Sequence, residues 1–419
     1  MIVRKVEASE LLEAYRISAL SFHWSLDLQG KTPEEFARGV RENPHSKFDS
    51  PATSIFAAFQ EDGEMMSGMG VLPYRVYFDG REVPMAGIGS VCTYPQHRRK
   101  GAVRAVFEKA LGGLYEKKVP FSYLYPFSEQ FYAKFGYCRS SQSTRWDFDL
   151  RAIPDASIPG VFSLHRPGEE IGGFQAAYQA FAPKLNMMVA RDEMDWDAVK
   201  NADPFKGESH AFLYRDQMGT PAGYFVFEKE TGDRGRRIMS CKEMAFDGFP
   251  TLKAIMAFCK TFSADYDGVS FKMPSSLNLD HFCVDYPQSG TTRRLLTNGM
   301  ARAVHVAEVL KSAAYKGSGS LALFVHDGFL PANNGLYRIV FENGEAKQVD
   351  FSPQPLIPFG TAKEQGADAE MSVNVFSAAI LGNCGIEDFA YMDGVKLYAD
   401  PGAADRVFYK KPCWINNYF

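Results

Sequence analysis

The sequence predicts a mixed α/β protein of three domains, each built from a β-sheet with helices packed against it. Two kinds of observation predict this fold class. Short runs with strand-like patterns alternate along the chain with segments of helical periodicity. Two segments at 150–160 and 285–292 contain proline and glycine, which interrupt regular structure. The expected domains span 1–150, 151–290 and 291–419, and each has an ordinary domain size.

In the first segment we expect a mixed sheet with one crossover helix at its centre. A helix is expected over 9–19, with Ser9 as its N-cap. Asp79-Gly80 is typical of a hairpin turn between two of the strands. The remaining elements are strands at 54–60, 66–77, 83–93, 120–125 and 145–150, and helices at 101–116 and 128–134.

The second segment resembles the first in the order of its elements, but it lacks a basic turn between strand and helix. The residues Ala245-Phe246-Asp247-Gly248-Phe249-Pro250 stand in that place. The expected elements are a helix at 171–182, strands at 210–215, 223–228 and 237–246, a helix at 250–263 and a strand at 268–273.

In the third segment an Asn343-Gly344 turn is expected to join two strands, and Gly382 to end a helix. The chain ends in an apolar, aromatic stretch from Trp414 to Phe419. The expected elements are a helix near 304–314, strands at 320–326, 336–341, 346–351 and 369–373, and a helix around 375–381.

Composition excludes several classes of function. The 419 residues include 46 Lys and Arg against 50 Asp and Glu, a formal net charge of −4, so we expect neither nucleic acid nor a membrane as partner. The seven cysteines form no CxxC pair, and we expect no metal. The charged N-terminus lacks an apolar signal segment, and no stretch approaches the ~20 apolar residues of a membrane helix. We therefore expect a cytoplasmic protein.

The sharpest motif lies between the strand at 83–93 and the helix at 101–116. Backbone N–H groups of such a loop, together with the helix dipole, form an anion site suited to a pyrophosphate. Gly101 permits a close backbone approach, and positive charge comes from Arg98, Arg99, Lys100 and Arg104. A solvated basic turn is the alternative, which the strand–loop–glycine–helix context disfavours.

The order R-R-x-G-x-x-R after a strand resembles the acetyl-CoA pyrophosphate loop of GCN5-related N-acetyltransferases (GNAT). The stretch from Ser128 to Tyr137 resembles that family's FYxxFGY element, whose first tyrosine lies beside the thioester sulfur. The resemblance implies that acetyl-CoA is the cosubstrate and that Tyr132 is the general acid; a merely packing aromatic is the alternative. The implied acetyl-CoA-binding residues are Val91, Cys92, Thr93, Arg98, Arg99, Lys100, Gly101, Ala102, Val103, Arg104, Ser128 and Glu129.

Two acetyltransferase-like segments, the second without its loop, precede a segment like a sterol carrier protein. This order resembles the enhanced intracellular survival (Eis) acetyltransferases. In that family the free carboxylate of a C-terminal Phe enters the active site as general base, and this chain also ends at Phe419. The resemblance therefore implies a catalytic role for the Phe419 carboxylate. It also implies a homo-oligomer, since family members resemble hexamers.

The chemistry of amine acetylation requires such groups. After an amine attacks the thioester, its nitrogen becomes strongly acidic, so a carboxylate with a pKa of ~3.5 can accept the proton. A tyrosine with a pKa of ~10 can protonate the departing thiolate. Backbone N–H groups of Val91–Thr93 are expected to stabilise the oxyanion. Cys92 could instead carry the acyl group, although a buried strand thiol is the commoner outcome.

The acceptor is expected to be a small-molecule or peptide primary amine. His23, Trp24 and Asp27 follow the first helix, where an acidic side chain could attract an amine; an exposed Asp27 without this role is equally consistent. Mycobacterial relatives that take aminoglycosides carry an acidic residue just before the terminal Phe. This chain has Tyr418 there, which disfavours polyamine-rich antibiotics.

Two other functions stay open. A longer-chain acyl-CoA N-acyltransferase is one, because N-myristoyltransferases also pair two such domains with a terminal carboxylate. A lipid- or ligand-binding protein with a degenerate acetyltransferase domain is the other. The intact loop at 98–101 and Tyr132 disfavour the binding protein.

Overall fold

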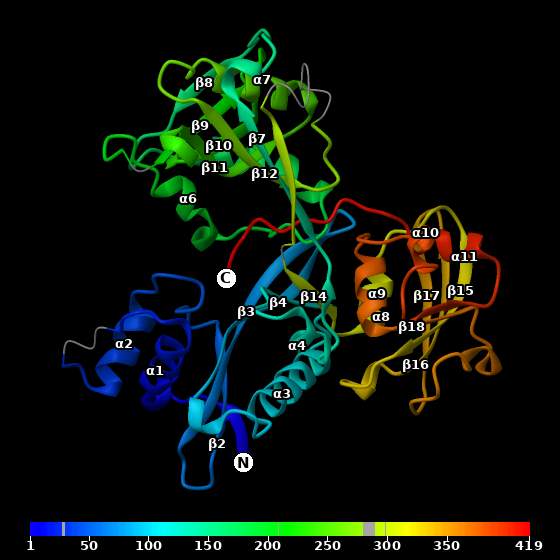
Figure 1. The fold of residues 1–419 in the computed structure, drawn as a ribbon. Helices are drawn as coiled ribbons and strands as arrows, with labels where there is room; N and C mark the ends of the chain where they lie inside the picture. Colours follow the sequence, from blue (N-terminus) through cyan, green and yellow to red (C-terminus); the bar gives the residue numbers. More distant parts are fainter. Residues whose placement is uncertain (27–29, 208, 280–289, 298) are drawn as a thin grey trace. The chain divides into compact units, whose positions relative to one another are not determined.

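The computed structural model describes residues 1–26, 30–207, 209–279, 290–297 and 299–419. Contacts divide the chain into two units, drawn in Figure 1. The first unit consists of Met1–Ser140, Gly299–Lys411 and Asn417–Phe419. The second consists of Ser141–Asn298 and Pro412–Asn416.

The first unit contains a mixed sheet with strand order β1-β2-β3-β4-β5-β14-β6. Its neighbours pair antiparallel except β4 and β5, which run parallel and are joined by the crossover helix α3. The strands are β1 (Ile2–Lys5), β2 (Ser54–Phe59), β3 (Met65–Phe78), β4 (Arg81–Thr93), β5 (Phe121–Leu124), β6 (Cys138–Arg139) and β14 (Met300–Ala303).

Helices cover both faces of this sheet (Figure 1). On one face, α1 and α2 bury an apolar cluster that includes Leu12, Ile17 and Phe36. On the other, α3 buries the face formed by Val106, Phe107, Ala110 and Leu111. Full burial of a side chain such as Val, Leu or Phe contributes about 1.5–3 kcal/mol to stability. The helices are α1 (Leu11–Phe22), α2 (Pro33–Glu42), α3 (Ala102–Glu116) and α4 (Glu129–Ala133).

The first unit also contains a second sheet, with strand order β17-β16-β15-β18-β19. Asn343 and Gly344 both have positive φ at the turn from β16 to β17, and Gly382 has a φ of 86° just after α9, so both predicted turns are confirmed. The strands are β15 (Gly319–His326), β16 (Gly335–Glu342), β17 (Glu345–Pro353), β18 (Ala369–Ser372) and β19 (Val395–Leu397). The helices are α8 (Val306–Ser312), α9 (Val373–Ile380), α10 (Ile386–Phe389) and α11 (Pro401–Asp405).

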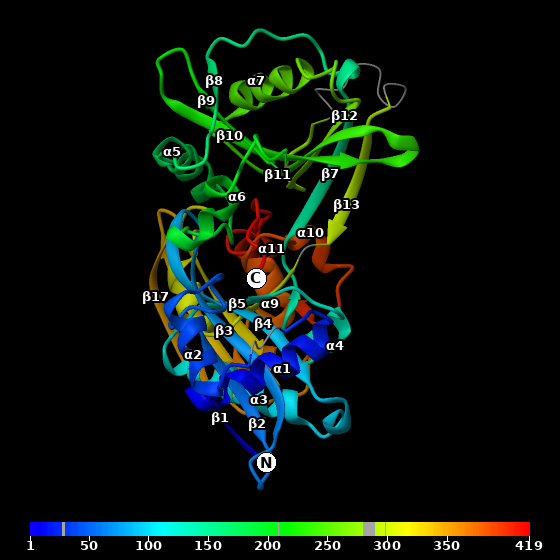
Figure 2. The ribbon, with the colours of Figure 1, turned by 90° about the vertical axis from the view of Figure 1, so that its left-hand side faces the viewer.

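The second unit contains a sheet with strand order β13-β7-β12-β11-β10-β9-β8, with α5 and α7 on opposite faces (Figure 2). Its Trp414, which is 2% exposed, donates from Nε1 to the Ser143 hydroxyl at 3.0 Å. The strands are β7 (Gln142–Asp149), β8 (Val161–Leu164), β9 (Ser209–Arg215), β10 (Pro221–Thr231), β11 (Arg237–Phe246), β12 (Gly268–Pro274) and β13 (Thr292–Thr297). The helices are α5 (Gly172–Phe181), α6 (Asp197–Lys200) and α7 (Phe249–Lys260).

Two strands belong to sheets other than those their sequence segments indicated. We expected the strand at 145–150 to complete the first domain, but β7 pairs with β12 and β13 in the second unit. Conversely, β14 lies in the first sheet, between β5 and β6. A local pattern identifies a strand, whereas its partners depend on contacts far away in the sequence.

Two details near the N-terminus also differ from expectation. The N-cap of α1 is Glu10 and not Ser9, because a 3-10 turn at Ala8–Glu10 precedes the helix. Helix α2 was not among the predicted elements, although its signal is present in the sequence. The Thr32 hydroxyl accepts from Glu35 N–H at 3.2 Å and the Glu35 carboxylate accepts from Thr32 N–H at 2.9 Å, which is a capping box.

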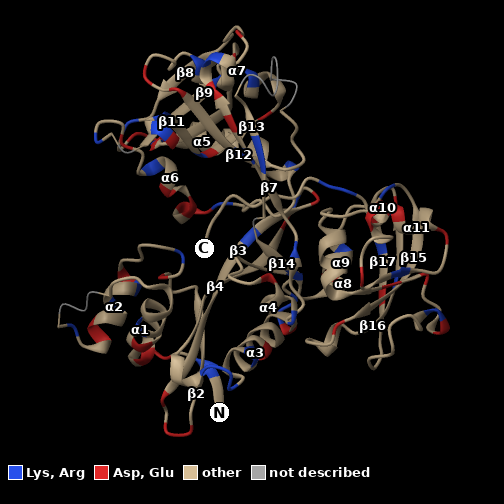
Figure 3. Cartoon of the chain, viewed as in Figure 1, with Lys and Arg blue, Asp and Glu red and all other residues tan. Residues whose placement is uncertain are grey.

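Charges of both signs are interspersed along the chain (Figure 3). None of the helices in the described ranges combines the length and apolar character needed to cross a membrane. In those same ranges, no three His, Cys, Asp or Glu side chains gather into a group that could hold a metal ion.

Candidate active site

The loop between β4 and α3 has the backbone geometry of an anion cradle. Arg99 has a φ of 63° and Gly101, the N-cap of α3, a φ of 80°, so the chain turns sharply into the helix. The first backbone N–H bonded within α3 is that of Ala105, which donates to Gly101 O at 3.1 Å. The preceding N–H groups, of Ala102, Val103 and Arg104, have no acceptor within the helix and carry the positive end of its dipole.

A cavity of about 640 Å³ lies against this cradle. Of the residues expected to bind acetyl-CoA, the cavity is lined by Val91, Cys92, Thr93, Arg98, Arg99, Gly101, Ala102, Val103 and Arg104. The structure therefore brings most of them together around one space.

Three of the expected acetyl-CoA-binding residues are not part of the lining. The ammonium of Lys100 lies 3.3 Å from Nδ1 of His97. The Ser128 hydroxyl caps α4 by accepting from Phe131 N–H at 3.3 Å, and Glu129 pairs with Arg139 at 2.8 Å.

Sequence analysis missed several residues that line the cavity. Ser21 and Phe22 come from the end of α1, and His97 from the basic loop. Phe127, Phe131 and Phe135 form an aromatic wall. The four-residue spacing of these phenylalanines around α4 was the signal available in the sequence.

Beside the cavity, β4 presents a backbone edge that β5 does not cover. The parallel pairing runs from Met85↔Phe121 to Ile88↔Leu124, where β5 ends, whereas β4 continues to Thr93. Ser90 has a φ of 51° next to a register shift between β3 and β4, which twists β4 locally. The end of β4 therefore has backbone groups on that edge which an extended ligand could pair.

Tyr132 lies behind the aromatic wall and is 3% exposed. Its ring centroid is 5.1 Å from that of Phe131 and 5.3 Å from that of Phe127, although Tyr132 itself is not part of the lining. Burial raises the pKa of its hydroxyl above the ordinary value, so the group stays protonated at neutral pH. Within the described residues, its hydroxyl forms no hydrogen bond.

Tyr137 is also buried, but its hydroxyl has a partner. Its oxygen lies 2.7 Å from the hydroxyl oxygen of Ser122, which in turn donates to Ala86 O at 3.0 Å. The Tyr137 hydroxyl is therefore held by a hydrogen bond in the core, whereas the Tyr132 hydroxyl has no such bond among the described residues.

Phe419 lies on β4 within the first unit. Its ring centroid is 4.7 Å from that of Tyr74 and 5.4 Å from that of Tyr125. A Cβ added at Gly87 would lie 2.7 Å from Cε2 of Phe419, and one added at Gly89 would lie 3.8 Å from its carboxyl carbon. The glycines of β4 therefore leave room for the terminal residue, whose carboxyl carbon lies beside Gly89.

The expected acceptor-binding residues are spread around the first unit. Tyr418 is 82% exposed, and its ring packs tilted against Tyr125 with 4.5 Å between ring centroids. The Tyr125 hydroxyl donates to Asn417 O. His23 caps the end of α1, and Trp24 contacts Tyr15 at 6.3 Å between ring centroids; neither lines the cavity. Asp27 lies outside the described residues.

Cys92 lines the cavity but is only 4% exposed, with Sγ 3.5 Å from Gly68 O. Burial raises the pKa of its thiol to about 12, so the thiolate needed for nucleophilic attack is scarce near neutral pH. We expect Cys92→Ala to change kcat by less than about threefold. Mass spectrometry of the wild-type protein quenched in acid during turnover should find no acetyl group on Cys92, and finding one would overturn this expectation.

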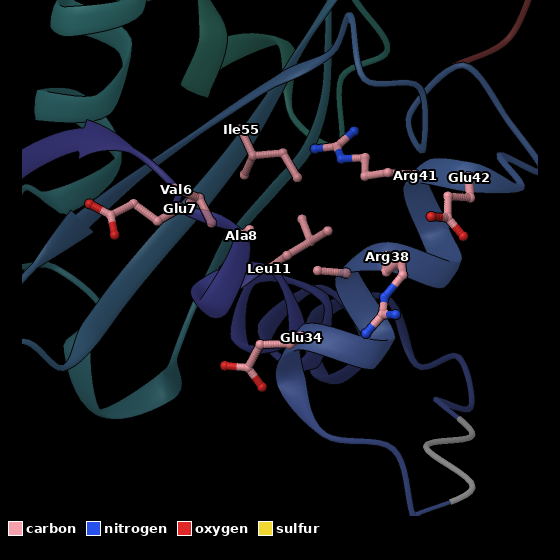
Figure 4. Close-up of a pocket in the computed structure, with 10 residues that line it drawn as sticks. Val6, Glu7, Ala8, Leu11, Glu34, Arg38, Arg41, Glu42 and Ile55 are labelled. Carbon is pink, nitrogen blue, oxygen red and sulfur yellow. The ribbon is translucent and has the colours of Figure 1, made fainter.

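A second cavity, of about 430 Å³, lies between α2 and the start of the chain (Figure 4). Its lining combines the apolar Val6, Leu11 and Ile55 with the charged Glu34 and Arg38. It contains no residue expected from the sequence to bind or react.

Comparisons with known proteins identify two domain families in this chain. Residues 2–139 match the acetyltransferase (GNAT) domain family, and residues 306–416 match the sterol carrier protein domain family. An uncharacterized N-acetyltransferase of Streptomyces avermitilis is 25% identical over 370 residues, covering 84% of this chain and 82% of that protein. The N-acetyltransferase Eis of Mycobacterium tuberculosis is 27% identical over 184 residues, covering 41% of this chain and 44% of Eis.

Solved structures share the fold over the whole chain. A probable N-acyltransferase from Enterococcus faecalis has a TM-score of 0.81 at 19% identity, covering 100% of this chain and 99% of that one. Eis1 from Mycobacterium abscessus has a TM-score of 0.78 at 17% identity, covering 100% of both chains. This chain therefore combines an acetyltransferase (GNAT) domain at its N-terminal end with a sterol carrier protein domain at its C-terminal end, and it is similar to Eis acetyltransferases in sequence and fold.

Proposed function

We propose that the protein transfers the acetyl group of acetyl-CoA directly to a primary amine within a ternary complex. The observation that carries this proposal is that three features meet at β4. They are the loop that leads from β4 into α3, the edge of β4 that β5 does not cover, and Phe419. The donors fit the cosubstrate, because free N–H groups and guanidinium groups are the partners that a pyrophosphate requires.

In this proposal the residues of the cradle hold the pyrophosphate and β4 holds the extended arm. The N–H groups of Ala102–Arg104 and the guanidinium groups of Arg98 and Arg104 bind the phosphates. The backbone of Val91–Thr93 pairs with the pantetheine arm and stabilises the oxyanion that develops on the thioester carbonyl.

Two groups move protons. The Phe419 carboxylate accepts the proton from the amine nitrogen, directly or through a water molecule, once attack has made that nitrogen acidic. The Tyr132 hydroxyl donates its proton to the departing CoA thiolate, and its raised pKa keeps the proton available until charge develops on the sulfur.

The surroundings of Phe419 bear on the acceptor. Tyr74, Tyr125 and Tyr418 form an aromatic surface beside it. The ammonium of Lys47 lies 4.1 Å from the centroid of the Tyr74 ring and adds positive charge there. We therefore expect an amine with one ammonium group and an aromatic or apolar body, and we expect poor turnover of acceptors with several ammonium groups.

The proposal is tested by binding and turnover together. Calorimetry measures acetyl-CoA binding, and thiol titration measures CoA release with phenethylamine, an alkylamine, an amino-acid amide and an aminoglycoside as acceptors. Binding of acetyl-CoA with release of CoA that depends on the amine is the expected result. Absence of acetyl-CoA binding would contradict the proposal.

Gly101→Leu should weaken acetyl-CoA binding about tenfold or more. A side chain there occupies the approach to the cradle, and a φ of 80° strains any residue with a Cβ. Gly80→Leu is a matched control, because Gly80 has a φ of 79° and is equally open but lies in the β3–β4 hairpin. Both variants should lose similar stability in thermal unfolding. Equal acetyl-CoA affinities in calorimetry would show that the cradle is not the binding site.

A further inference from the structure

The turn that follows Tyr132 closes tightly against the C-terminal half of the chain. Phe135 N–H donates to Tyr132 O, and Gly136 N–H to Ala133 O, both at 3.0 Å. Gly136 has a φ of 85°, and a Cβ added there would lie 2.8 Å from Cζ of Arg302. Only glycine therefore permits this turn to approach Arg302.

Asn374, the second residue of α9, binds both ends of the turn. Its Nδ2 donates to Ala133 O at 3.0 Å and to Tyr137 O at 2.9 Å. One side-chain amide thereby uses both of its N–H bonds on two carbonyls of the Tyr132 turn. It does so from 241 and 237 residues away in the sequence, inside the region that matches the sterol carrier protein family.

A buried ion pair holds the middle of the same turn. Arg302 donates from Nη1 to Phe135 O, and its Nη2 lies 2.5 Å from Oδ2 of Asp327. Both side chains are 0% exposed. Asp327 in turn accepts from Asn333 Nδ2 at 3.0 Å and from Leu330 N–H at 2.9 Å. Carbonyls at the start, middle and end of the turn are thus bound by side chains from the C-terminal half of the chain.

We infer that Asn374 is a positioning residue for acetyl transfer, which fixes the turn at Ala133–Tyr137 and with it the direction of the Tyr132 hydroxyl. This inference rests on the proposed role of Tyr132 as general acid. The helix that carries Tyr132 has five residues and is too short to be stable by itself. The sterol carrier protein domain therefore supports the general acid in addition to preceding the C-terminal carboxylate.

The test compares Asn374→Ala and Asn374→Asp with a matched control in the full-length protein. Asn383 donates from Nδ2 to Arg139 O at 3.2 Å, so Asn383→Ala removes a similar hydrogen bond without touching the turn. Turnover is measured with acetyl-CoA and the fastest amine of the panel above. Because about 1 Å of misplacement can cost ~10²-fold, both Asn374 variants should lower kcat about tenfold or more. Acetyl-CoA affinity should stay within about twofold, and Asn383→Ala should stay near wild type.

A double-mutant cycle separates positioning from a general loss of structure. In a Tyr132→Phe background, Asn374→Ala should cause little further loss, because the group it positions is gone. An equal loss in both backgrounds would overturn the inference, as would an Asn374→Ala variant that behaves like Asn383→Ala. Either result leaves the proposed function standing if Tyr132→Phe alone is slow. Wild-type turnover by Tyr132→Phe would instead contradict the role of Tyr132 and this inference together.

Discussion

A polypeptide tag fused after Phe419 is expected to lower turnover by at least about 100-fold while leaving acetyl-CoA affinity unchanged. The tag converts the carboxylate into an amide, which cannot accept a proton. The loss is large because general bases contribute ~10²–10⁴-fold. The aromatic contacts of the Phe419 ring with Tyr74 and Tyr125 do not involve the carboxylate and can persist. Steady-state kinetics and calorimetry on the same preparation measure the two effects.

Two further variants separate the carboxylate from the ring, and a third protein is a control for the tag. Deletion of Phe419 moves the carboxylate back by about 3.3–3.6 Å in an extended tail and should be nearly as damaging as the tag. Phe419→Ala keeps the carboxylate and should lose less, through a poorly anchored tail. A tag before Met1, which is 52% exposed, controls for the presence of a tag. Full activity of the C-terminally tagged protein would exclude the carboxylate as base.

Tyr132→Phe is expected to lower kcat by ~10²–10⁴-fold, the usual contribution of a general acid. The substitution removes only a hydroxyl that forms no hydrogen bond within the described residues. Folding and acetyl-CoA affinity should therefore survive. Steady-state turnover across pH measures the loss, and thermal unfolding confirms that the variant is folded.

Tyr137→Phe is the matched control for Tyr132→Phe. It also removes one buried tyrosine hydroxyl, but this hydroxyl is bonded to Ser122. The expected cost is about 1 kcal/mol of stability with turnover near wild type. The reverse pattern, with Tyr137→Phe slow and Tyr132→Phe unchanged, would assign the acid to Tyr137.

Local signals in the sequence were sufficient for most of the central strands and helices and for the cradle, but not for α2. Gly101 ends the basic loop and starts α3 as expected. The glycine at the N-cap and the apolar face of the helix are both signals carried by neighbouring residues in the sequence. The aromatic wall of Phe127, Phe131 and Phe135 was visible as a spacing, but the same spacing occurs in ordinary cores. Whether this aromatic wall faces a cavity depends on how α1 and α4 pack, and local sequence patterns do not determine that packing.

Contacts between distant segments could not be predicted from local patterns in the sequence. The pattern of 145–150 indicates a strand but not that its partners are β12 and β13. Likewise, Asn374 is an ordinary polar residue in the first turn of a helix, and only the structure reveals its bonds to Ala133 and Tyr137. The pairing of β7 and the hydrogen bonds of Asn374 both join segments that lie more than a hundred residues apart in the sequence.

We propose that one site binds acetyl-CoA and passes its acetyl group to an amine. The most direct test mixes the wild-type protein with acetyl-CoA and phenethylamine and quantifies both products by mass spectrometry, with a long-chain acyl-CoA in a parallel reaction. We expect one acetylated amine for each CoA released, and faster transfer from acetyl-CoA than from the long-chain donor. Release of CoA without acetylated amine, or transfer from the long-chain donor alone, would contradict it.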